Sequence, residues 1–90
     1  MRQFLFIEDS AHGWLEVDRD DLALLGIEKE ITEYSYVRRG KVYLEEDNDM
    51  CLFLDKMDER GIEYTIKKQY EDGYSALRNY QNYKYVPNER

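Results

Sequence analysis

The strongest constraint on the fold is an apolar stripe in residues 48–60, which predicts a helix with one face to bury. Apolar side chains recur there at intervals of three and four residues, at Met50, Phe53, Leu54 and Met57. Acidic and amide side chains at 47–49 can cap the start of this helix, and Gly61 can end it. A helix with a single apolar face needs a second layer to cover it, so the remaining segments must supply that layer.

A second, shorter helix is predicted at residues 19–25. Asp18 is a good N-cap, and Asp21 stands three residues on, where its carboxylate can answer the cap. Gly26 supplies the left-handed position after the last turn, and Ile27 can fold back on Leu22. All of these signals lie within ten residues, so they predict both ends of the helix.

The other segments have the residue types and periodicity of strands. The predicted strands are residues 3–8, 14–17, 34–37, 42–44 and 62–69. Gly40 can take positive φ in the turn of a hairpin between the third and fourth strands. The order β-β-α-β-β-α-β with short connections predicts an α+β fold, a small antiparallel sheet with both helices packed on one face.

The chain has 90 residues, the size of one domain. Residues 1–70 are predicted to form the α+β core domain, and residues 71–90 a tyrosine-rich C-terminal extension. In the extension, Ala76 and Leu77 allow a short helix or turn. Residues 83–90 suit an edge strand or an ordered tail, because Pro87 is tolerated only at an edge or an end.

Charge and cysteine content predict a cytoplasmic protein. The net charge is −7, and residues 1–66 hold 17 acidic against eight basic residues, which disfavours nucleic acid as the main ligand. Cys51 stands alone, so no internal disulfide forms, and we interpret it as a small buried hydrophobe. No stretch approaches the roughly 20 apolar residues of a membrane span, and the first apolar run is shorter than that of a signal peptide.

Four blocks of residues carry a resemblance to a known family. They are AHGWLEV (11–17), LLGI (24–27), YSY (34–36) and VYLEEDND (42–49). In this order they resemble a family of small hypothetical proteins of bacteria, phages and plasmids. The resemblance covers about residues 3–65 and leaves the tyrosine-rich extension outside it. It implies a cytoplasmic setting and a mobile-element origin, and no residue role is carried over from it.

Aromatic and basic residues alternate in the extension, and tyrosine, tryptophan and arginine are favoured at protein interfaces. The interface candidates are Trp14, Tyr74, Arg78, Tyr80, Tyr83 and Tyr85. Two other interpretations stay open: the tyrosines cover a thin core with wet hydroxyl groups, or they stack on single-stranded nucleic acid. An edge strand or the tyrosine-rich end would also support a homodimer.

An acidic cluster at residues 45–49 suggests a different class of function. Carboxylates of this kind can hold a hard cation, and the single histidine could join them as a ligand or as a general base. The residues of this metal hypothesis are His12, Glu46, Asp47 and Asp49. The same carboxylates also suit the start of the following helix, where capping needs them without any metal.

The leading hypothesis is a small acidic binding protein without catalytic activity. It would dock onto a host protein as a modulator or inhibitor, for example by placing an acidic face against a nucleic-acid-binding groove. No catalytic residue and no cofactor is assigned. The alternatives are the metal- or ligand-binding protein or enzyme using His12, and single-stranded nucleic-acid binding through the C-terminal extension.

Overall fold

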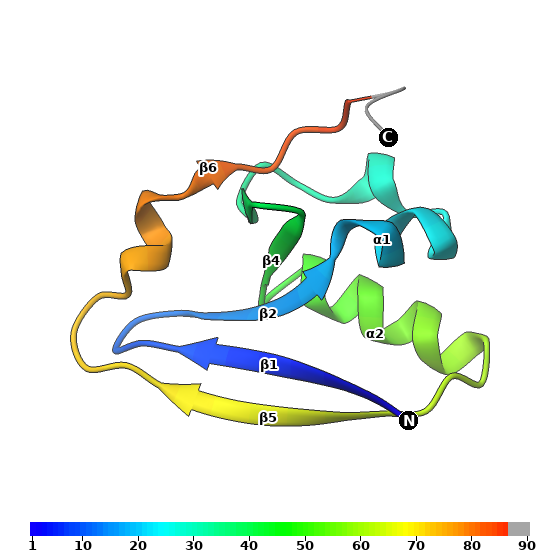
Figure 1. Ribbon diagram of the computed structural model, residues 1–90, viewed down its shortest axis with the longest axis horizontal. Helices are drawn as coiled ribbons and strands as arrows, with labels where there is room; N and C mark the ends of the chain where they lie inside the picture. The colour runs from blue at the N-terminus through cyan, green and yellow to red at the C-terminus, as the bar shows by residue number, and fades with distance from the viewer. Residues whose placement is uncertain (87–90) are drawn as a thin grey trace.

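A computed structural model describes residues 1–86, which form one six-stranded sheet with two helices (Figure 1). The strands are β1 (Arg2–Glu8), β2 (Gly13–Asp18), β3 (Tyr36–Arg38), β4 (Lys41–Glu45), β5 (Tyr64–Tyr70) and β6 (Gln81–Asn82). The helices are α1 (Arg19–Leu25) and α2 (Asp49–Glu59), with single 3₁₀ turns at η1 (Glu28–Glu30) and η2 (Ala76–Asn79). The strand order is β5-β1-β2-β4-β3-β6, and the fold is α+β as predicted.

The expectation of a purely antiparallel sheet is wrong at one strand pair. β5 runs parallel to β1, while the other four pairs are antiparallel. The cause is the crossover through α2, which carries the chain from β4 across β2 and β1 to the edge of the sheet (Figure 1). A connection of this length, with a helix, is what a parallel pair requires. The predicted order also had no sixth strand before residue 83, whereas β6 pairs with β3.

The predicted helix ends are confirmed at α1. The Asp18 backbone N–H donates to Asp21 Oδ2 at 3.2 Å. Gly26 takes a φ of 72°, and the Ile27 N–H donates to the Leu22 carbonyl at 3.0 Å. This pair of features closes the last turn, so a seven-residue helix is held by local interactions at both ends.

The hairpin between β3 and β4 has a shorter first arm than predicted. β3 begins at Tyr36 rather than at residue 34, and the turn is made by Arg39 and Gly40, with φ of 50° and 81°. Positive φ at both central positions is the geometry of a tight hairpin turn that matches the twist of the strands. Residues 34 and 35 precede the strand, and Tyr34 is exposed while Ser35 is buried.

Both helices pack on one face of the sheet, as predicted. The buried residues of this face come from alternate positions of β1, β2 and β4 and from the two helices: Phe4, Phe6, Leu15, Val17, Val42, Leu44, Leu22, Leu25, Phe53 and Met57. The opposite face carries a smaller cluster made by the intervening positions and by η2: Ile7, Trp14, Tyr43 and Leu77. We call the first the helix face and the second the η2 face.

The C-terminal segment is part of the same packed structure. Leu77 is buried on the η2 face, and Tyr83 joins the core of the helix face, where its hydroxyl donates to the Glu28 carbonyl at 2.7 Å. The strand of this segment is β6, just before the predicted residues 83–90, of which 87–90 lie outside the described residues. Cys51 is exposed, which corrects its interpretation as a buried hydrophobe.

Candidate binding site

A pocket of about 220 Å³ lies on the η2 face, where β2 begins and β4 ends. Eight residues from four separate parts of the chain line it: His12, Gly13, Trp14, Tyr34, Tyr36, Glu45, Glu46 and Arg78. We call it the Trp14 pocket. Three aromatic rings, an imidazole, two carboxylates and a guanidinium therefore surround a space large enough for one side chain of a partner.

Trp14 anchors this pocket and is only 3% exposed. The rings of His12 and Tyr36 each meet it edge-on, with centroids 6.2 Å away. The residue before Trp14 must be glycine for a different reason, because a Cβ atom at position 13 would clash with the Phe6 ring of the helix face. The sequence His-Gly-Trp thus turns the chain into β2 at a point where only glycine fits.

Arg78 forms a wall of the pocket and is held by the buried carboxylate of Asp9. Its Nε and Nη2 atoms donate to the two Asp9 oxygens at 2.9 and 3.0 Å. Asp9 also accepts backbone N–H groups from Ala11, His12 and Ser75. Hydrogen bonding to the Arg78 guanidinium is the main cause that holds the pKa of Asp9 well below its usual range.

The same guanidinium is stacked between aromatic rings. Its central carbon lies 5.3 Å from the Trp14 ring centroid and 4.6 Å from that of Tyr74. Cation–π contacts of this kind fix the plane of an arginine as well as its position. The pocket wall is therefore preorganised, and it joins the turn after β1 to η2, near the end of the chain.

The rim of the pocket is aromatic and largely open to solvent. Tyr34, which lines the pocket, is 72% exposed, and Tyr74, which contacts Arg78 without lining the pocket, is 74% exposed. The Glu46 carboxylate, which also lines the pocket, forms no hydrogen bond or ion pair within residues 1–86. The pocket therefore presents exposed aromatic surface together with a hydrogen-bond acceptor.

Glu45 has a structural role that the sequence did not reveal. Its carboxylate accepts the backbone N–H groups of Asp47, Asn48 and Asp49 at 2.7–2.8 Å, so it caps the start of α2. The predicted caps at 47–49 do not carry this bond, since Asn48 is the N-cap without a side-chain hydrogen bond. A carboxylate at a helix start is stabilised by the free N–H groups and by the helix dipole.

The residues of the metal hypothesis do not form a metal site. Within residues 1–86 there is no group of three or more His, Cys, Asp or Glu side chains placed to hold a metal ion. Asp49 is fully buried and accepts hydrogen bonds from Thr32 and Ser35. His12 and Glu46 do line one pocket, whereas Asp47 and Asp49 are not among its lining residues.

Of the predicted interface residues, the structure brings together Trp14, Tyr74 and Arg78. Tyr80 lies on the same face, with its ring 5.3 Å from Tyr43 and its hydroxyl accepting from Arg38. Tyr83 and Tyr85 lie elsewhere and pack against the core of the helix face. The tyrosines of the C-terminal segment therefore do not form one shared stacking surface.

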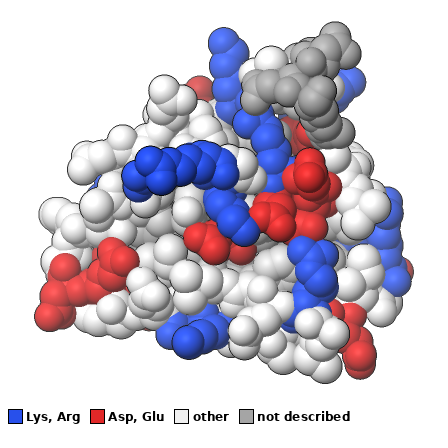
Figure 2. Space-filling model, viewed as in Figure 1, with Lys and Arg blue, Asp and Glu red and all other residues white. Residues whose placement is uncertain are grey.

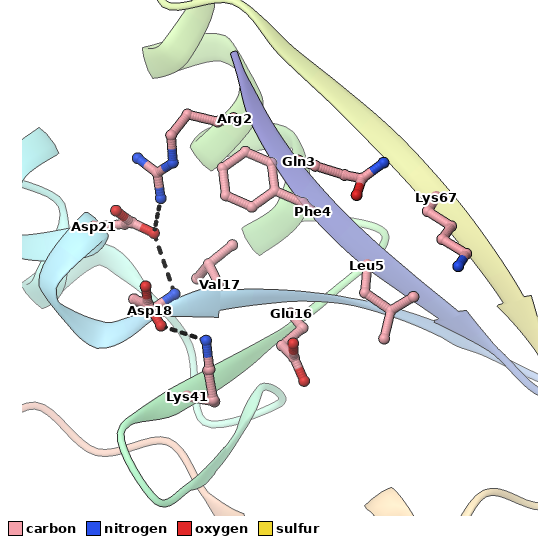
Figure 3. Close-up of a pocket in the computed structure, with 10 residues that line it drawn as sticks. All are labelled: Arg2, Gln3, Phe4, Leu5, Glu16, Val17, Asp18, Asp21, Lys41 and Lys67. Atoms are coloured by element: carbon pink, nitrogen blue, oxygen red, sulfur yellow. Dashed lines mark hydrogen bonds and ion pairs between the residues drawn. The ribbon is translucent and has the colours of Figure 1, made fainter.

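A second pocket, also of about 220 Å³, lies along β1 and β2 (Figure 3). Four of its charged side chains form two ion pairs: Arg2 Nη2 lies 2.7 Å from Asp21 Oδ2, and Lys41 Nζ lies 2.6 Å from Asp18 Oδ1. Hydrogen bonding to Asp18 raises the pKa of Lys41. Lys67 stands apart from both ion pairs in this view. With its charges paired internally, this pocket offers a ligand less than the Trp14 pocket does.

No family model, curated protein or solved structure matches this chain. No helix in residues 1–86 has the length and apolar character needed to cross a membrane. The fold and the site together define a small α+β domain with a preorganised aromatic pocket, and the chemistry of that pocket is the basis for a functional proposal.

Proposed function

We propose that the protein is a non-catalytic binding module that docks onto a host protein and modulates or inhibits it. Its contact surface is centred on the Trp14 pocket and includes the exposed rings of Tyr34 and Tyr74. The observation that carries the proposal is the grouping of two exposed tyrosines with one fixed guanidinium: the Tyr74 ring contacts Arg78, and Tyr34 lines the same pocket as Arg78.

Two physical arguments support protein binding at this surface. Tyrosine, tryptophan and arginine supply most of the energetic anchors of protein interfaces, since they bury large areas with few rotatable bonds. Binding costs conformational entropy for every side chain that must be ordered, and preorganisation lowers this cost. Asp9 already fixes Arg78, and both are joined to Trp14 before any partner arrives.

Charge defines the chemistry of the partner. The chain carries a net charge of −7, and Glu46 offers a carboxylate with no partner in the described residues. A docking surface that presents a basic side chain beside apolar ones would complement both features, and opposite net charges also speed encounter. Figure 2 shows acidic and basic groups interspersed over one face of the molecule. We therefore assign the choice of partner to the residues of the pocket and not to a uniformly acidic surface.

The test is a capture experiment from host-cell lysate treated with nuclease, with three forms of the protein compared. Tyr34→Ala/Tyr74→Ala removes the two exposed rings at and beside the pocket, and Leu24→Ala removes a largely exposed apolar group on α1 as a control. The proposal predicts one stoichiometric protein partner for wild type and Leu24→Ala, and its loss from the double variant. Retention by the double variant, or a partner that disappears with nuclease, would overturn it.

A further inference from the structure

The second candidate surface is the free edge of the sheet formed by β5. This strand has seven residues, and within residues 1–86 its only strand partner is β1 (Figure 1). Its last four residues, 67–70, are all exposed. An edge strand of this length presents a row of backbone groups that can pair with another chain.

The hydrogen bonds at the two ends of β5 show which backbone groups are free. Arg2 N–H donates to the Glu63 carbonyl at 3.3 Å, and Glu71 N–H donates to the Glu8 carbonyl at 2.8 Å. A parallel ladder uses every second residue, so odd-numbered residues from 63 to 71 bond to β1. The N–H and C=O groups of Tyr64, Ile66, Lys68 and Tyr70 therefore point away from the sheet.

The side chains of β5 add a local positive charge to this edge. Lys67 and Lys68 are adjacent, exposed, and form no ion pair within residues 1–86. Figure 3 shows Lys67 apart from the acidic side chains of the neighbouring strands. On a chain with a net charge of −7, two lysines without an ion pair in residues 1–86 provide a local attraction for carboxylates at this edge.

A second copy of the chain is a poor occupant for the same reason. Symmetric antiparallel pairing over the full length of β5 would place Lys67 opposite Lys67 of the other copy. Like charges directly opposite each other destabilise a strand pair. Lysine on an edge strand is also a common protection against self-pairing.

We propose that the outer edge of β5 binds an extended acidic segment of a protein partner, which adds a seventh strand to the sheet. Backbone hydrogen bonds to Tyr64, Ile66, Lys68 and Tyr70 provide affinity, and the lysines select carboxylates on the incoming strand. No residue of β5 lines the Trp14 pocket, so binding at this edge and docking at the pocket can be tested separately.

The probe is a blocked peptide of alternating Glu and Val residues, as long as β5, added to isotope-labelled full-length protein. The proposal predicts amide shift changes along β5 and slowed hydrogen exchange at the four even-numbered residues, with little change at Thr65, Lys67 and Gln69. A peptide of alternating Lys and Val is the matched control. Equal binding of both peptides, no binding of the acidic one, or self-association of the protein through β5 would overturn the proposal.

Two variants separate backbone pairing from charge. Lys68→Gln removes only the charge and should weaken the acidic peptide about two- to fivefold. Lys68→Pro also removes an outward N–H that the ladder with β1 does not use, and edge strands tolerate proline at such a position. It should abolish binding while the β1 and β2 amide signals persist. If Lys68→Pro disturbs those signals, the wild-type protein provides the test: an equal slowing of exchange at odd- and even-numbered residues on addition of the acidic peptide would contradict the proposal.

Discussion

The two faces of the sheet are covered by different elements: the helix face holds most of the core, and the η2 face carries the proposed docking surface. The helix face is covered by α1 and α2, whose apolar side chains meet those of three strands, and Phe53 is completely buried. The η2 face is covered mainly by a single four-residue turn, which buries Leu77, and by the ion pair between Asp9 and Arg78. Tyr34 and Tyr74 are largely exposed, and they are the rings on which the proposed docking surface depends.

The largest expected effect tests the helix face. Phe53→Ala should lower the free energy of unfolding by about 3–5 kcal/mol, because it removes a fully buried ring that packs edge-on against Phe4. Leu77→Ala should cost about 2 kcal/mol, the low end for a buried leucine, since a single turn can settle into the space. Urea denaturation measures both values. Equal costs would mean that the two faces are packed alike.

A smaller effect is expected from Asp9→Ala, which removes the acceptor of Arg78 and of the buried Ser75 N–H. Leaving that N–H unsatisfied costs about 1–3 kcal/mol, and the loss should appear first as opening of residues 71–86. Hydrogen exchange should speed up in η2 while the amides of α2 stay protected. Uniform acceleration across both faces would show that the ion pair supports the whole domain rather than the η2 face.

Acid should weaken the η2 face through the same carboxylate. Because Arg78 holds the pKa of Asp9 below its usual range, the unfolded chain binds a proton at this site more readily than the folded one. The stabilisation is therefore present above the pKa of an unfolded aspartate, about 3.9, and is lost as the pH falls through the folded value. Denaturation curves below about pH 4 should fall more steeply for wild type than for Asp9→Asn, and parallel curves would contradict this assignment.

The smallest expected effect is on the stability of Tyr34→Ala/Tyr74→Ala. Both rings are mostly exposed, so each substitution should change the free energy of unfolding by no more than about 0.5 kcal/mol. Thermal melting beside the capture experiment separates a lost contact from a lost fold. A large drop in melting temperature would place these tyrosines in the structure of the η2 face, and the binding interpretation would need other residues.

Features with local causes were predictable from the sequence. The ends of α1 depend only on residues 18–27. The apolar stripe of α2 depends only on the spacing of residues within that helix, and it identified the face that packs on the sheet. The alternation of apolar and polar side chains in residues 62–69 identified a strand but not its direction. That direction depends on the edge of the sheet to which α2 leads the chain. Parallel pairing of β5 with β1 is a property of the whole topology, and no segment carries a signal for it.

The binding site was predictable only in part. Residue type singled out Trp14, Tyr74 and Arg78, because these amino acids are typical of interfaces. Asp9 was missed, since it reads as a turn residue and its partner lies 69 positions away. Tyr34 was assigned to a strand, and the place where β3 begins decides its exposure. Tyr83 is buried, as in the alternative in which the tyrosines cover a thin core, but residue type alone did not separate it from the interface candidates.

The central claim, that the surface around the Trp14 pocket docks onto a protein, is tested most directly by photo-crosslinking in host cells. A photoreactive phenylalanine analogue is placed at position 34, or at position 24 on α1 as the control. The account predicts one light-dependent adduct with a host protein from position 34, suppressed by excess wild-type protein but not by excess Tyr34→Ala/Tyr74→Ala. Adducts of equal yield from both positions, or none from position 34, would contradict it.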